Sequence, residues 1–283
     1  MTEKPRGPIG VFDSGFGGLT VLRSIRNLLP RYDYIYLGDN ARAPYGNRSF
    51  DTVYTFTLQA VKALFDRGCP LVILACNTAS AKALRTIQQK DLPVMEDSSR
   101  RVLGVIRPTA EKVAHLTDTG HIGIFATPGT VASGSYQIEI AGQNPNLVTV
   151  AHPCPMWVPL IENGQAHTPG ADYFIEKDAK ELMSLDPEID TVILGCTHYP
   201  IVKDIIGRHL PPNVRIVSQG EIVAASLEDY LNRHPEMECR LSRAPEGKDG
   251  TVTYLTTETP EIFNPLASVF AGHPVQSSQI TVS

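Results

Sequence analysis

A short stretch of this sequence occurs twice, and each copy places a cysteine directly after an apolar run. Residues 72–78 read VILACNT and residues 192–198 read VILGCTH, so Cys76 and Cys196 lie 120 residues apart (196 − 76). A second pair of similar stretches precedes them, IGVFDS at residues 9–14 and IGIFAT at residues 122–127. The doubling predicts two similar halves, each with a cysteine at a strand end, and two thiols that face one ligand.

Apolar runs alternate with amphipathic stretches along most of the chain, which is typical of parallel α/β sheets. Helices are predicted at residues 18–29, 49–67, 220–233 and 260–271, and Thr127-Pro128 is typical of a helix start. A charged segment with proline and glycine, residues 240–250, is predicted to be a surface loop. Strands are predicted at residues 9–12, 34–37, 71–74, 102–105, 121–125, 147–150, 191–194, 214–217 and 252–255.

The expected fold class is therefore α/β, with two similar lobes that are each a mainly parallel sheet flanked by helices. We expect residues 1–97 plus 212–283 to form the first lobe and residues 98–211 the second. The tail after residue 212 is too short for a third domain and is expected to fold back on the first lobe. Because ligands bind beyond the carboxyl ends of parallel strands, the active site is expected in the cleft between the lobes.

Composition narrows the possible partners. The 283 residues carry a net charge of −5 with no basic cluster, so no nucleic acid is expected. No apolar run approaches the ~18 residues of a membrane span, and the opening residues MTEKPR lack the apolar stretch of a signal peptide, so we expect a cytoplasmic protein. The five cysteines show no CxxC spacing, which favours free thiols and predicts no metal site.

Several predicted strands are followed directly by residues that can take part in chemistry. Cys76, Cys196 and Asp13 each come immediately after an apolar strand. A lone cysteine in this position is usually a small core residue, but packing alone does not explain why both are followed by polar groups. Those groups open the next helices, where their donors can bind a carboxylate: Asn77, Thr78, Thr197 and His198.

Three further stretches leave alternatives open. The glycine-rich residues 13–19 (DSGFGGL) do not form GxGxxG, so they are either an anion- or amine-binding loop or a tight turn between strand and helix. The polar residues 39–46 (DNARAPYG) either cover a site or form a plain surface loop. Glu162 follows an apolar turn and is either a cleft carboxylate or part of a solvated helix face.

Four stretches in this order resemble the glutamate racemase family, within the aspartate/glutamate racemase superfamily: residues 9–18, 36–46, 75–79 and 195–200. The resemblance spans about residues 8–217. It implies a cofactor-independent two-base racemisation of L- and D-glutamate, which supplies D-glutamate for peptidoglycan. Glutamate would be the small-molecule partner, and a homodimer is possible.

The resemblance also implies roles for particular residues. Cys76 and Cys196 would be the two bases, assisted by Asp13 and His198 respectively. Asp39 and Glu162 match carboxylates near such sites. The substrate would be lined by Asp13, Ser14, Tyr45, Gly46, Asn77, Thr78, Thr197 and His198. The chain departs from the family pattern at residues 218–221 (SQGE), where Asp-Ser-Gly is common, and at Arg107, where an acid is common.

Paired thiols suit the inversion of a carbon centre. One base removes the proton from one face while the other returns a proton to the opposite face, so one sulfur must be a thiolate and the other a thiol. Two other functions stay open at this point. One is an aspartate racemase of the same superfamily. The other is a non-catalytic two-lobed amino-acid-binding protein, which would explain the lobes but not the paired cysteines.

Overall fold

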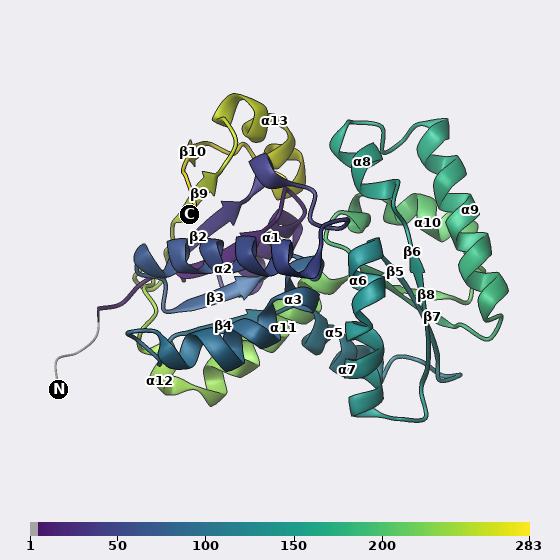
Figure 1. Cartoon of the computed structure of the whole chain (residues 1–283), viewed down its shortest axis with the longest axis horizontal. Coiled ribbons are helices and arrows are strands. Elements are labelled where there is room, and N and C mark those ends of the chain that lie inside the picture. Colours follow the sequence, from purple (N-terminus) through teal and green to yellow (C-terminus); the bar gives the residue numbers. More distant parts are fainter. Residues whose placement is uncertain (1–4) are drawn as a thin grey trace.

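The computed structural model describes residues 5–283, which form two parallel β-sheets surrounded by helices (Figure 1). The strands are β1 (Ile9–Asp13), β2 (Tyr34–Gly38), β3 (Leu71–Leu74), β4 (Arg101–Gly104), β5 (His121–Ala126), β6 (Val148–Pro153), β7 (Thr191–Gly195), β8 (Arg215–Val217), β9 (Val252–Thr256) and β10 (Ser277–Gln279). The helices are α1 (Gly18–Leu28), α2 (Phe50–Asp66), α3 (Asn77–Lys82), α4 (Leu84–Thr86), α5 (Ile106–Val113), α6 (Pro128–Ser133), α7 (Ser135–Gln143), α8 (Trp157–Glu162), α9 (Pro169–Leu185), α10 (Lys203–His209), α11 (Gln219–Arg233), α12 (Pro235–Glu238) and α13 (Pro260–Ala271).

The two sheets repeat one strand order. The first sheet runs β10-β9-β2-β1-β3-β4 and the second runs β6-β5-β7-β8, with every strand pair parallel. The order β2-β1-β3-β4 thus recurs as β6-β5-β7-β8, and β9 and β10 extend only the first sheet. The sequence repeats lie on equivalent strands, because β1 corresponds to β5 and β3 to β7. Strands β1, β3 and β7 are buried along their whole length, which fits their β-branched composition.

The C-terminal part of the chain joins the two sheets. Helix α11 follows β8 of the second sheet and packs along α1 beside the first sheet. In Figure 1 it is the green helix that crosses back beneath the purple and blue strands. One apolar cluster contains Ile9 and Ile73 of the first sheet together with Trp157, Tyr199 and Leu227. The two sheets therefore share buried apolar contacts around the region where their strands end.

The predicted α/β architecture with two lobes is confirmed, and each of the nine predicted strands overlaps an observed one. Strand β10 was not predicted, because Ser277–Gln279 is short and polar. The helix expected from Thr127-Pro128 is interrupted at Gly134, which adopts a left-handed conformation between α6 and α7.

The predicted lobe boundaries do not follow the sheets at two strands. Strand β4 falls in the range 98–211, but it pairs with β3 in the first sheet. Strand β8 falls in the range 212–283, but it pairs with β7 in the second sheet. The division of the chain into two lobes with ends at these residues stays a prediction. Among residues 5–283, none of the helices combines the length and apolar character that crossing a membrane demands.

Candidate active site

Both repeated cysteines line one cavity between the two sheets. The cavity lies beyond the carboxyl ends of β1 and β3 on one side and of β5, β6 and β7 on the other. Among the residues expected at the site, its walls include Ser14, Tyr45, Gly46, Cys76, Asn77, Thr78, Glu162, Cys196, Thr197 and His198. The structure thus brings together residues that are up to 184 positions apart in the chain (198 − 14).

Cys76 lies at the end of β3, where its side chain caps helix α3. The sulfur accepts a hydrogen bond from the backbone N–H of Ala79 at 3.4 Å and lies 3.3 Å from the hydroxyl of Ser14. The side chain is buried, and burial together with the nearby carboxylate of Asp13 raises the pKa of the Cys76 thiol to about 12. Cys76 therefore carries its proton at neutral pH in this structure.

Asp13 lies at the end of β1 and is almost completely buried. Its Oδ2 accepts a hydrogen bond from the backbone N–H of Gly15 at 2.9 Å, whereas its Oδ1 has no partner among the described residues. Burial raises the pKa of the Asp13 carboxyl above its ordinary value. The hydroxyl of Ser14, rather than the Asp13 carboxylate, makes the direct contact with Cys76, so Asp13 acts on that sulfur through its charge.

Cys196 lies at the end of β7 and belongs to a chain of three side chains. Its sulfur lies 3.8 Å from Nδ1 of His198, and Nε2 of His198 lies 2.8 Å from Oε1 of Glu162. Burial alone would lower the pKa of His198, but the bonds to Cys196 and Glu162 outweigh it and raise the pKa to about 10. A protonated imidazole beside the sulfur stabilises negative charge there. Glu162 also lines the cavity, as the first of the two alternatives for this residue expects.

The glycine-rich turn after β1 is a point of close contact between the lobes. A Cβ atom at Gly17 would lie 2.2 Å from Oγ1 of Thr197 and 2.5 Å from Nδ1 of His198. In the same region the hydroxyl of Thr20 donates a hydrogen bond to the carbonyl of Thr197 at 3.2 Å. The turn therefore contributes Ser14 to the cavity and gives the second cysteine loop room to approach.

The helix starts that follow the two cysteines present hydrogen-bonding groups to the cavity. The hydroxyl of Thr78 lies 3.0 Å from that of Thr127 and 3.4 Å from that of Thr130, both from the second lobe. The side-chain amide of Asn77 bonds to Tyr136 and Gln219. These residues are buried, so those of their donors and acceptors that are still without a partner face the cavity or one another.

The loop after β2 covers one wall of the cavity. Tyr45 and Gly46 line it, and the Gly46 carbonyl accepts a hydrogen bond from the backbone of Gly129 at 2.8 Å. Asp39 is fully buried but lies behind this wall and is not among the lining residues. Its carboxylate accepts hydrogen bonds from Arg42, from Thr257 and from the hydroxyl of Tyr45. Asp39 therefore holds the loop and does not face the cavity.

The geometry of this site agrees with the comparisons to known proteins. A model of the Asp/Glu/Hydantoin racemase family matches residues 9–227, which cover both cysteines and strands β1 to β8. The chain belongs to this family. The expected family resemblance is thereby confirmed.

Several members of the family match over nearly the whole chain. A glutamate racemase of Roseobacter denitrificans is 41% identical over 280 residues, covering 95% of this chain and 98% of that protein. Among solved structures, a glutamate racemase isoform from Bacillus anthracis has a TM-score of 0.88 at 31% identity, covering 99% of this chain and 98% of that one.

A second solved structure, a glutamate racemase from Francisella tularensis in complex with D-glutamate, has a TM-score of 0.83 at 32% identity and covers 98% of each chain. An aspartate racemase from Picrophilus torridus is 18% identical with a TM-score of 0.51, which is a likeness of fold alone.

Several residues of the cavity wall were not expected from the sequence, among them Thr127 and Cys154. Thr127 lines the cavity at the end of β5, and the repeat of residues 9–14 at residues 122–127 was a signal for it, since Thr127 is the counterpart of Ser14. Cys154 also lines the cavity and is at the same time a buried member of the larger apolar cluster. Its position at the end of β6, beside the central strand β5, carries no signal in the sequence.

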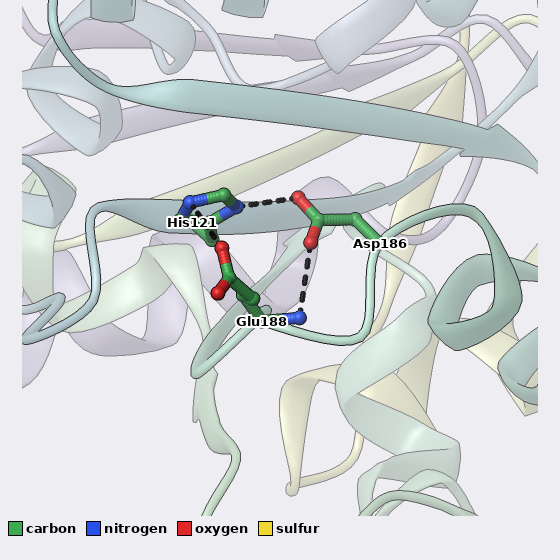
Figure 2. A group of neighbouring side chains, drawn as sticks. All are labelled: His121, Asp186 and Glu188. Atoms are coloured by element: carbon green, nitrogen blue, oxygen red, sulfur yellow. Dashed lines mark hydrogen bonds and ion pairs between the residues drawn. The ribbon is translucent and has the colours of Figure 1, made fainter.

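Two groups of side chains outside the cavity could offer three ligand atoms to a metal ion: His121, Asp186 and Glu188, and His152, Asp178 and Glu181. Figure 2 shows the first group, in which the two ring nitrogens of His121 point at different carboxylates. These contacts measure 2.7 Å to Asp186 and 3.0 Å to Glu188, which are ordinary ion-pair distances. The hydrogen bonds account for this arrangement, and neither group includes Cys76 or Cys196.

Proposed function

We propose that this chain is a glutamate racemase, an isomerase that interconverts L- and D-glutamate by two-base chemistry without a cofactor. One observation carries the proposal: Cys76 and Cys196, at equivalent strand ends of the two sheets, line one cavity. The identity of about 40% to named glutamate racemases over 95% of the chain supports glutamate as the substrate. Packing would be satisfied by alanine or valine at either position and does not account for a pair of thiols in one cavity.

In the proposed reaction one sulfur removes the Cα proton as the other donates a proton to the opposite face. Burial keeps Cys76 protonated, so the free protein is set up with Cys76 as the acid. The imidazole of His198 stabilises negative charge on Cys196 and thereby prepares this sulfur as the base. The roles exchange when the other enantiomer binds.

The carbanion that forms at Cα has no cofactor to accept its electrons, so the substrate carboxylate must take the charge. Donors placed around that carboxylate stabilise the developing charge because they are fixed in a buried site. We assign this role to the amide and hydroxyl groups of Asn77, Thr78 and Thr197, which line the cavity. Ser14, Tyr45 and Gly46 form the remaining polar wall in this assignment.

The residues that assist the two sulfurs are assigned from their contacts and charges. Glu162 holds His198, and His198 serves Cys196. Asp13 serves Cys76 by its charge, and the Ser14 hydroxyl contacts the Cys76 sulfur directly. Asp39 supports the site indirectly through its bond to Tyr45.

The proposal extends to the pathway, the cellular location and the oligomeric state of the protein. The D-glutamate would enter peptidoglycan synthesis, and hence cell-wall biogenesis and cell shape. The protein would act in the cytoplasm, where its five free cysteines stay reduced. It would form a homodimer, which sedimentation velocity over a range of protein concentrations can test.

The decisive experiment follows optical rotation and Cα-deuterium incorporation for L-glutamate, D-glutamate and L-aspartate in buffered D₂O without added cofactor. We expect both glutamate enantiomers to reach a ratio of one, with aspartate much slower. Equal rates on aspartate would favour the aspartate racemase alternative. Glutamate binding without loss of rotation would identify a binding protein and overturn the proposal.

A further inference from the structure

Gln219 closes a ring of hydrogen bonds around a residue of the cavity wall. The side-chain N–H of Asn77 donates to Oε1 of Gln219 at 2.6 Å, and the side-chain N–H of Gln219 donates to the hydroxyl of Tyr136 at 2.7 Å. That hydroxyl in turn donates to Oδ1 of Asn77 at 2.7 Å. The ring has one donor direction, because the same Gln219 NH₂ group also donates to the Val105 carbonyl, which can only accept.

The ring is buried and firmly anchored. Asn77, Tyr136 and Gln219 are 2%, 1% and 3% exposed, so an unmade hydrogen bond here carries the full cost of desolvation. The Gln219 amide also donates to the hydroxyl of Thr109 at 3.1 Å and to the carbonyl of Val105 at 3.3 Å. Burial raises the pKa of Tyr136 well above its ordinary value, so its hydroxyl keeps its proton at any working pH.

The ring joins three elements from both parts of the chain. Asn77 begins α3 after the first sheet, Tyr136 lies on α7, and Gln219 begins α11 after the second sheet. Figure 1 places α3, α5 and α11 together where the two halves meet.

The ring fixes the orientation of the Asn77 side-chain amide. Tyr136 requires an oxygen acceptor and Gln219 requires an N–H donor, so an inverted amide would lose both bonds. With one Asn77 N–H committed to Gln219, its second N–H has no acceptor among the hydrogen bonds of the described residues. Asn77 lines the cavity, so this N–H is left for a ligand oxygen.

We propose that Gln219, acting with Tyr136, is a positioning residue that fixes the Asn77 amide so that its free N–H binds a carboxylate of the substrate. The proposal rests on the proposed function for the identity of that substrate. Gln219 itself does not line the cavity, and it acts only through Asn77.

Two substitutions break the ring at different bonds. Tyr136→Phe removes the donor to Asn77, and Gln219→Leu removes both bonds of Gln219 within the ring. We expect KM for L- and D-glutamate to rise on the order of 10-fold in each variant, as loss of a buried hydrogen bond implies, and kcat to fall as well, because the Asn77 amide is also assigned to the developing charge. The matched control is Tyr34→Phe, which removes an equally buried tyrosine hydroxyl bonded to the Leu29 carbonyl at 2.7 Å, outside the cavity. It should lower Tm and leave KM unchanged.

In Gln219→Glu, the pH dependence of KM distinguishes a positioning role from a purely structural one. An ionised carboxylate accepts from Asn77 but cannot donate to Tyr136, whereas a protonated carboxyl restores a donor. The KM of this variant relative to the unsubstituted protein should therefore fall as pH is lowered. A ratio that is independent of pH, or unchanged KM in Tyr136→Phe, would overturn the proposal, and so would an equal KM increase in Tyr34→Phe.

A second measurement does not depend on activity. The Asn77 side-chain N–H bonded to Gln219 should exchange slowly with solvent in ¹⁵N-labelled protein, its signal being assigned by its disappearance in Asn77→Asp. Exchange should accelerate in Gln219→Leu, which removes the acceptor of this N–H, and should stay slow in Gln219→Glu, whose carboxylate still accepts from it. Rapid exchange in the unsubstituted protein would refute the ring itself. If the protein does not racemise glutamate, the proposed function fails, and this measurement still decides the positioning role.

Discussion

At the scale of single residues, the two thiols have unlike surroundings. Cys76 is held by a hydroxyl and a backbone N–H near a buried carboxylate, whereas Cys196 adjoins an imidazole that is itself held by Glu162. The first setting favours a protonated sulfur, whereas the second places the His198 imidazole, whose pKa is raised, beside the sulfur. The difference supports distinct starting roles for two residues that the sequence repeat presents as equivalents.

Loss of either sulfur should stop racemisation. Cys76→Ala and Cys196→Ala each remove the acid–base group for one face of Cα, so kcat/KM should fall by at least about 1,000-fold in both directions. Circular dichroism detection of both enantiomers measures this. The matched controls are Cys69→Ala, buried outside the cavity, and the exposed Cys239→Ala, which should keep nearly full activity. Near-normal turnover in either cavity variant would refute the two-base assignment.

His198 should make the folded protein lose stability as pH rises above neutrality. Its pKa is about 10 in the folded state against 6.5 for the ordinary group, so the folded state binds more protons between these values. This contribution is complete below pH 6.5 and is lost as pH rises through 10. Between pH 7 and 9, Tm should therefore fall more steeply for the unsubstituted protein than for His198→Asn. Parallel Tm curves would contradict the shift.

At the scale of elements, the site depends on how closely two strand-end turns approach. Gly17→Ala would place a methyl group against Thr197 and His198, so the second cysteine loop would have to move. We expect activity to fall about 100-fold, as displacement of catalytic groups by ~1 Å implies, with far-UV circular dichroism retained. Gly142→Ala in α7 is the control, because nothing lies within 4 Å of its added Cβ. Full activity in Gly17→Ala would show that the contact is not needed.

The elements also show where sequence reasoning succeeds and where it stops. Strands such as β3 and β7 are short β-branched runs that end in small residues, and this local pattern was enough to find them. The pattern could not assign β4 and β8 to their sheets, because pairing depends on contacts between distant parts of the chain. For the same reason the cysteines were found from their repeat, whereas the partners of Asn77, which lie 59 and 142 residues away, were not.

At the scale of the molecule, the two halves are joined by packing as well as by the chain. Helix α11 lies along α1, and one apolar cluster includes side chains from both sheets. Local stability should therefore not differ between the halves, because separating them would expose this shared apolar surface.

Unfolding should accordingly be a single transition. The one tryptophan, Trp157, is buried beside Phe125 and Tyr199 and reports on the second half, whereas far-UV circular dichroism reports on the whole chain. Urea denaturation followed by both signals should give coincident curves. A tryptophan transition displaced from the circular dichroism transition would show that the halves unfold separately.

The unlike surroundings of the two sulfurs have a consequence for successive turnovers. When Cys76 gives up its proton and Cys196 gains one, the protein is left in the state suited to the opposite enantiomer. Because burial makes Cys76 hold its proton tightly, a thiolate at Cys76 is unfavourable in this product state. For a short time after turnover, which of the two sulfurs carries the proton thus depends on the enantiomer that was released. Before the same enantiomer can react again, a proton must return to Cys76, and this step adds to the turnover time at saturating substrate.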